Sequence, residues 1–291
     1  MRKFGYMICL LALFASCTKD NTERHSSMIL EAWIDAEGYP TVLIHKSYIL
    51  DSASDTVQAL EELVEGQLIP FGKVVVSDGE NEVVLTGRLD TMYLPPYTYT
   101  TIDMEGEVGK TYTVTATYKD LCATATTTIP PVAHLDSLCV SAGQAGIRNV
   151  HAYMHADSPE AYYVMFLRKR GTKQYQLCPF GVFTGRDATN GQLDIPVYDP
   201  LTKTTDYEGL SYYFHEGDSA VYQLKVAQVD EAAYDFWKAY NEQILSRGIF
   251  FVSMYKNLPN NVSGGFGNFA GFGSSVYRFN LIKDTTFRYK N

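Results

Sequence analysis

The chain has 291 residues, with 24 Lys and Arg residues against 33 Asp and Glu residues, and its formal net charge at pH 7 is −9. At about 150 residues per domain, the length predicts two domains. An apolar fraction of 46% with 20% charged residues excludes a chain that is disordered throughout. The acidic balance argues against a nucleic-acid partner, because affinity for a polyanion comes mainly from clustered Lys and Arg.

Residues 1–16 have the pattern of an export signal. Two basic residues precede an apolar run at 4–15, which is too short to span a bilayer because a spanning helix needs about 20 residues. The run ends in Phe14-Ala15-Ser16-Cys17, which resembles the bacterial lipobox, where the cysteine is acylated after cleavage. Acyl chains on Cys17 would hold the protein on a membrane, with 17–27 as a flexible tether. The alternative is an ordinary signal peptide followed by an incidental cysteine.

Residues 28–131 have the alternation and turn signals of an antiparallel β domain. Asp78-Gly79-Glu80-Asn81 predicts a hairpin turn, and 55–64 predicts a short helix in a connection. About seven short strands in this length favour an immunoglobulin-like sandwich, which Ile129-Pro130-Pro131 would end. The expected strands are 28–34, 41–48, 73–77, 82–86, 111–118 and 122–129.

Residues 132–291 predict a second β-rich domain, either a sandwich or a barrel, with one helix packed on it. The helix is expected near 231–247, because Asp230 is a good N-cap and Ala233, Trp237, Tyr240 and Ile244 form one apolar stripe. The fold class is therefore mainly β. The expected strands are 147–154, 161–168, 174–178, 221–229, 249–255 and 275–282.

No metal or cofactor is expected. His151 and His155 lie four residues apart on an expected strand, where about 13 Å would separate them, too far for one ion. Beyond Cys17, the cysteines Cys122, Cys139 and Cys178 allow at most one disulfide, and buried free thiols are favoured.

Aromatic residues provide the candidate contact sites. Residues 264–273 combine five glycines with Phe266, Phe269 and Phe272. This segment is either a connection anchored in the core by its phenylalanines or an aromatic loop that contacts a ligand or partner. Tyrosines cluster in two places, where they either fill half-buried sheet positions or form a binding surface. The candidates among them are Tyr93, Tyr97, Tyr99, Tyr212 and Tyr213.

Six tripeptides have Asp, then Ser or Thr, then a residue with a methyl group. This pattern resembles the O-glycosylation sequon of exported Bacteroidetes proteins, although turn chemistry explains it equally well. The acceptors would be Ser52, Thr56, Thr91, Ser137, Ser219 and Thr285.

Several segments together resemble a family of Bacteroidetes outer-membrane lipoproteins catalogued as a domain of unknown function. The resemblance covers nearly all of the chain after residue 17 and implies an immunoglobulin-like first half, lipid attachment to the outer membrane at the cell surface, and a TonB-dependent receptor as neighbour. It implies no catalytic residues. The segments are Leu30-Glu31-Ala32-Trp33-Ile34, 73–81 (KVVVSDGEN), 109–115 (GKTYTVT), 126–131 (TTTIPP), Tyr234-Asp235-Phe236-Trp237 and 264–271.

The sequence leads to the hypothesis of a non-enzymatic surface lipoprotein that captures a peptide, glycan or other nutrient ligand, or assists a TonB-dependent transporter. A surface adhesin or a structural envelope lipoprotein is the alternative. An enzyme is the third option, although the sequence has no recognisable nucleophile–base or metal constellation.

Overall fold

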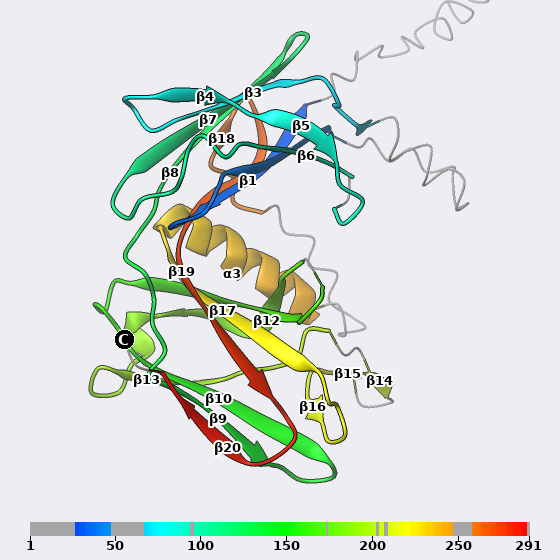
Figure 1. Ribbon diagram of the computed structural model, residues 1–291, viewed down its shortest axis with the longest axis vertical. Helices are drawn as coiled ribbons and strands as arrows, with labels where there is room; N and C mark the ends of the chain where they lie inside the picture. The colour runs from blue at the N-terminus through cyan, green and yellow to red at the C-terminus, as the bar shows by residue number, and fades with distance from the viewer. Residues whose placement is uncertain are drawn as a thin grey trace, which may run out of the picture.

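The computed structural model describes residues 27–47, 67–93, 96–172, 174–201, 204–206, 209–246 and 258–289. Within these residues the chain forms one long sheet, two shorter sheets, a two-stranded ribbon and one long helix, α3 (Figure 1). The prediction of a mainly β protein with a packed helix is confirmed. The expected helix at 55–64 and the expected strand at 249–255 lie outside the described residues.

The long sheet extends through both halves of the molecule. Its strand order in the described part of the chain is β12-β11-β17-β19-β1-β2-β6-β5. Strand β19 joins the halves, because residues 265–272 pair in parallel with β1 whereas 273–280 pair antiparallel with β17. The strands are β1 (Met28–Asp35), β2 (Thr41–Lys46), β5 (Thr86–Leu89), β6 (Tyr97–Thr100), β11 (Tyr162–Lys169), β12 (Gln176–Thr184), β17 (Val221–Val229) and β19 (Gly265–Asn280).

The first sandwich forms where the first short sheet, of order β18-β8-β7-β3-β4, packs on β1, β2 and β6. Strand β7 alternates as predicted, with Tyr112 and Val114 in the core and its threonines facing outward. The predicted turn at 78–81 joins β3 to β4. The strands of this sheet are β3 (Lys73–Ser77), β4 (Glu82–Val84), β7 (Thr111–Tyr118), β8 (Leu121–Thr128) and β18 (Val262–Ser263).

A tyrosine near the start of β7 supports the immunoglobulin-like description. The Tyr112 hydroxyl accepts a hydrogen bond from the Glu107 N–H at 2.9 Å and donates one to the Glu105 carbonyl at 3.1 Å. A tyrosine that bonds to the backbone a few residues upstream, at the entry to a strand, is the tyrosine corner of immunoglobulin-like folds.

The second sandwich forms where the second short sheet, of order β13-β10-β9-β20, packs on β11, β12, β17 and the second part of β19. The two sheets share no strand among the described residues, so the structure is a sandwich rather than a barrel. The remaining elements are β9 (Ser137–Ala142), β10 (Ile147–His155), β13 (Gln192–Pro196), β14 (Thr204–Asp206), β15 (Gly209–Ser211), β16 (Phe214–His215), β20 (Thr285–Arg288) and a 3-10 turn, η2 (Gly185–Asp187).

Helix α3 (Glu231–Ser246) packs on the outer face of the long sheet, opposite the second core. Asp230 caps it as predicted, since its Oδ1 accepts the Ala233 N–H at 2.9 Å. The other oxygen of Asp230 accepts from the Thr127 hydroxyl at 2.7 Å, and this hydroxyl accepts the Gly271 N–H at 2.8 Å. The helix is therefore bonded to the first sandwich and to β19, and it lies at the junction of the two halves (Figure 1).

The glycine-rich segment is a strand, so the expectation of a connection or loop there is wrong. Residues 265–273 belong to β19, and the glycines allow other backbone segments to pass closely. A Cβ atom on Gly267 would lie 1.9 Å from the Leu30 carbonyl oxygen, and one on Gly273 would lie 2.1 Å from that of Pro131. The division after residue 131 stays a prediction, although 262–272 pair with strands of the first sandwich.

The three cysteines are free, so no disulfide joins them. Cys178 is buried as expected, and its burial raises the pKa of the thiol, whereas Cys122 is exposed and Cys139 is half-buried. In the described part of the chain, no helix has the length and apolar character needed to cross a membrane.

Candidate ligand-binding site

A cavity of about 700 Å³ lies between α3 and the outer face of the long sheet. This volume falls in the range of small-molecule sites. The cavity is built at the junction of the two sandwiches, because its floor comes from strands of both halves. The residues that β1, β19 and α3 contribute are Glu31, Trp33, Asp35, Asn268, Ala270, Phe272, Phe236, Trp237 and Tyr240.

The two-residue period of the strands explains which side chains reach the cavity. In β1, Leu30 and Ala32 point into the first core, so Glu31 and Trp33 point to the opposite face. In β19, Phe269 belongs to the first core, and its neighbour Ala270 faces the cavity.

Aromatic side chains dominate the lining. Phe166 and Trp237 meet edge to face at a centroid distance of 5.0 Å, and Trp33 packs on Tyr93 at 5.9 Å. The chain has only two tryptophans, and both line this cavity. Flat aromatic faces with polar edges bind sugar rings and the side chains of peptides. The aromatic residues of the lining are Trp33, Tyr93, Phe166, Tyr175, Phe236, Trp237, Tyr240 and Phe272.

Two buried polar atoms at the lining residues have no hydrogen-bond partner within the described ranges: Asn268 Oδ1 and Trp237 Nε1. Asn268 is only 6% exposed and pairs in register with Glu31 on the neighbouring strand. A buried polar group without a partner costs about 1–3 kcal/mol. Both atoms are themselves covered by protein atoms, so they lie behind the cavity wall rather than on its surface.

Glu31 is the lining carboxyl group that the strand register pairs with Asn268. Its side chain is exposed by accessible surface, yet the protein atoms around it displace part of the water that would solvate a charge. Burial raises the pKa of Glu31, and the proximity of His45 partly opposes the increase. The environment therefore favours the protonated form of Glu31 more than water does.

An ion pair lies among the lining residues and links the two halves. Asp35 Oδ1 of β1 lies 2.5 Å from Lys225 Nζ of β17, and the Ser274 hydroxyl donates to the same oxygen at 2.6 Å. The Lys225 ammonium also lies 4.4 Å from the centroid of the Phe272 ring. At the rim, the Gln174 amide donates a hydrogen bond to the Met92 carbonyl, which ties together the loops that carry Tyr175 and Tyr93.

The structure brings only two of the predicted contact residues to the cavity, Tyr93 and Phe272. Tyr99 and Phe269 belong to the first core, and their burial removes them from any contact surface. Phe266 is 58% exposed at the start of β19 and does not line the cavity.

The other predicted tyrosines also lie apart from the cavity. Tyr97 packs against Tyr99 at 5.5 Å. Tyr213 is exposed and contacts Tyr198 at 6.0 Å, whereas Tyr212 is half-buried. The two tyrosine clusters therefore do not form one surface.

The sequence analysis missed Glu31, Trp33, Asn268 and the cavity face of α3. One signal was available, because Trp33 occupies the polar face of an alternating strand, where a tryptophan is unusual. Trp237 was expected in the apolar stripe of the helix. Nothing in the sequence indicated that these two tryptophans would line the same cavity.

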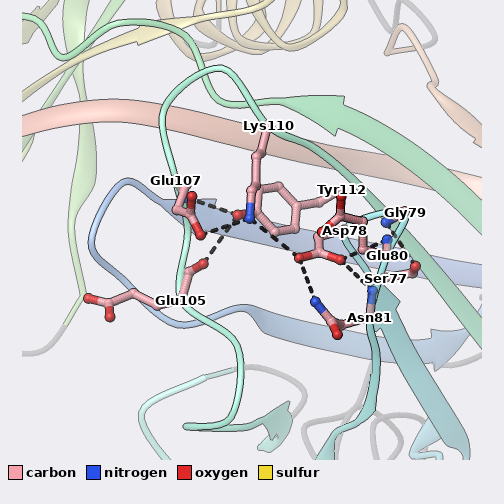
Figure 2. Close-up of polar contacts among 9 residues, drawn as sticks. All are labelled: Ser77, Asp78, Gly79, Glu80, Asn81, Glu105, Glu107, Lys110 and Tyr112. Atoms are coloured by element: carbon pink, nitrogen blue, oxygen red, sulfur yellow. Dashed lines mark hydrogen bonds and ion pairs between the residues drawn. The ribbon is translucent and has the colours of Figure 1, made fainter.

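A second polar cluster surrounds the hairpin turn and has a structural explanation (Figure 2). Asp78 Oδ1 accepts the backbone N–H groups of Asn81 at 2.7 Å and Glu80 at 3.0 Å, which lower the pKa of Asp78 to about 2. Lys110 Nζ lies 2.8 Å from Glu107 and 3.6 Å from Asp78. These bonds join the turn to the tyrosine corner of Tyr112.

His151 and His155 lie on strand β10 and bind different partners. His151 Nδ1 lies 2.7 Å from Asp194 Oδ1, and His155 Nδ1 lies 2.8 Å from Asp136 Oδ2. In the part of the chain that the structure describes, no three His, Cys, Asp or Glu side chains gather as a metal site would require.

Two of the proposed glycosylation sequons form turns. Asp90 Oδ1 accepts the Met92 N–H at 3.1 Å, and Asp218 Oδ1 accepts the Ala220 N–H at 2.8 Å, so Thr91 and Ser219 lie exposed within these turns. Glycosylation stays a prediction at every site. Of the other acceptors, Ser137 and Thr285 are half-buried on β9 and β20, and Ser52 and Thr56 lie outside the described residues.

Fold and site together define a protein of two β-sandwiches that share a sheet and form an aromatic cavity beneath a helix. The family model described as "Domain of unknown function (DUF4249)" matches residues 17–278, and the chain belongs to this family. No curated protein matches the chain.

Proposed function

We propose that the protein is a non-enzymatic lipoprotein of the outer membrane that captures a ligand in its junction cavity. The captured ligand, a glycan or a short peptide, would be passed to a TonB-dependent transporter. The observation that carries this proposal is the aromatic cavity of about 700 Å³, whose lining includes both tryptophans of the chain. Enclosed aromatic faces with a few polar groups are typical of small-ligand sites.

The contacts of the lining residue Asp35 favour binding over glycoside hydrolysis. Glu31 and Asp35 lie four residues apart on one strand, so about 13 Å separates their Cα atoms. Asp35 is also engaged by Lys225 and Ser274, which leaves it poorly suited to act as a nucleophile.

The anchor and the transporter partner rest on the sequence. Cys17 follows a short apolar run with small residues before it, and the resemblance to Bacteroidetes outer-membrane lipoproteins implies a TonB-dependent receptor as the neighbour. Two or more acyl chains on Cys17 would attach the protein stably. The transporter would then lie within reach of the tether at 17–27.

Membrane fractionation of the natural host tests the anchor and the partner together. We expect the wild-type protein to enter the outer-membrane fraction and to co-purify with a large β-barrel protein after solubilisation in a mild detergent. The Cys17→Ser protein should appear in the soluble fraction. Cys122→Ser is the matched control, because it removes an exposed thiol of the first sandwich and should change neither result. A Cys17→Ser protein that stays in the membrane fraction would overturn the anchor. A wild-type protein that purifies without a β-barrel partner would favour the alternative function, a surface adhesin.

A further inference from the structure

An open groove of about 750 Å³ lies next to the cavity and carries three arginines. Tyr175 lines both, so the two spaces are neighbours. The groove differs from the cavity in its chemistry, because its charged lining residues are Arg168, Arg278 and Arg288 and no carboxylate lines it among the described residues. The chain as a whole has a formal charge of −9, so its composition does not explain a patch of three like charges.

The sheet register places two of these arginines in one row. Arg168 of β11 pairs with Gln223 of β17, and Gln223 pairs with Arg278 of β19. Paired residues on neighbouring strands point to the same face, with the strands about 4.8 Å apart. Arg168 and Arg278 therefore flank Gln223 on the outer face of the long sheet. Arg288 reaches the groove from β20 in the second short sheet.

The guanidinium of Arg168 is held in place by its neighbours. Its Nε donates to Gln223 Oε1 at 2.9 Å, and its Cζ lies 4.3 Å from the centroid of the Tyr175 ring. Arg278 and Arg288 are exposed, and none of the ion pairs in the described ranges involves either of them. The groove therefore combines one oriented guanidinium with two that are available to a ligand.

We infer that this groove binds the oxyanion group of an organic ligand, as a carboxylate, phosphate or sulfate. A planar guanidinium donates two parallel hydrogen bonds to such a group, and these charge-assisted bonds are stronger than bonds between neutral groups. The Gln223 side chain lies between the two arginines of the row and extends the polar floor. The inference depends on the groove alone and holds whether or not the neighbouring cavity captures a nutrient.

Calorimetric titration of the full-length protein in a non-ionic detergent tests the inference. Sodium pyrophosphate, sodium glucuronate and neutral glucose are compared at constant ionic strength. We expect pyrophosphate or glucuronate to bind and glucose not to bind. Arg278→Gln combined with Arg288→Gln should weaken the binding about tenfold or more, because the two substitutions remove the charge-assisted hydrogen bonds of both available guanidinium groups. The anion that binds more tightly shows whether the groove prefers a phosphate or a carboxylate.

Lys73→Gln combined with Lys119→Gln is the matched control, because it also removes two positive charges, from the first sandwich, and should change the affinity less than about twofold. Binding of neither anion, or equal affinity in the Arg278→Gln/Arg288→Gln protein, would overturn the inference. Ala270→Leu, which fills the cavity, should leave anion binding unchanged. Anion binding that persists in Ala270→Leu shows that the groove acts independently of the cavity, so the failure of one proposal can be told from the failure of the other.

Discussion

Glu31 combines two opposing influences on a single carboxyl group. It lies on the cavity face of β1, where burial favours the protonated acid, whereas the nearby His45 favours the carboxylate. Burial is the larger effect, so the pKa of Glu31 in the folded protein lies above its ordinary value of 4.5.

We expect Glu31→Gln to be more stable than wild type near neutral pH. The folded protein binds the Glu31 proton more tightly than the unfolded chain does, so ionisation above the folded pKa lowers the stability of wild type. This loss decreases as the pH falls through the folded pKa, and it disappears below the unfolded value of 4.5. Urea unfolding at several pH values measures the difference between the two proteins.

Glu160→Gln, at an exposed residue of the second half, is the control and should show no such pH-dependent gain. A Glu31→Gln protein that is less stable than wild type near neutral pH would show that the ionised carboxylate stabilises the fold.

Much of the local structure around Glu31 could be predicted from the sequence, but the site could not. The alternation of Leu30, Glu31 and Ala32 predicts an amphipathic strand correctly. One of the two partners of that strand is β19, which comes from the other end of the chain, and no local pattern specifies such a pairing. Trp33 and Trp237 therefore could be assigned to a strand and a helix but not to one cavity.

Strand β19 shows why composition misled the sequence analysis at the scale of an element. Glycine is unfavourable inside strands, so a run with five glycines suggests a loop. In the structure the glycines lie where another backbone segment crosses the strand, as at Gly273, whose carbonyl accepts the Ala133 N–H at 3.0 Å. The absence of side chains at these positions permits the crossing.

We expect Gly273→Ala to destabilise the protein by about 2 kcal/mol or more, since the added Cβ would lie 2.1 Å from the Pro131 oxygen and one backbone segment must move. Gly79→Ala is the control. Its φ is +91° but no atom lies within 4 Å of the added Cβ, so it should cost about 1 kcal/mol, from backbone conformation alone. Urea unfolding compares the two. A smaller loss for Gly273→Ala than for Gly79→Ala would contradict the close crossing.

At the scale of the molecule, the two sandwiches share one long sheet. Strand β19 pairs with β1 in one half and with β17 in the other, and the Asp35–Lys225 ion pair lies across the same junction. We expect one calorimetric unfolding transition for the full-length protein. Val114→Ala in the first core and Leu224→Ala in the second should each lower the temperature of this whole transition.

Two separate transitions, with each substitution affecting only one, would show instead that the halves unfold independently. That result would also place the cavity at a mobile boundary, where its lining would not be held in one arrangement.

Intrinsic fluorescence tests the proposed binding most directly, because Trp33 and Trp237 are the only tryptophans and both line the cavity. Full-length protein and the Ala270→Leu variant are titrated with neutral oligosaccharides and short peptides. The melting temperature of Ala270→Leu is measured as well, to check that the variant is folded. We predict that one of these ligand classes changes the emission of wild type in a saturable way, and that Ala270→Leu loses this change. Emission that no ligand alters, or that changes equally in Ala270→Leu, would contradict ligand capture in the cavity.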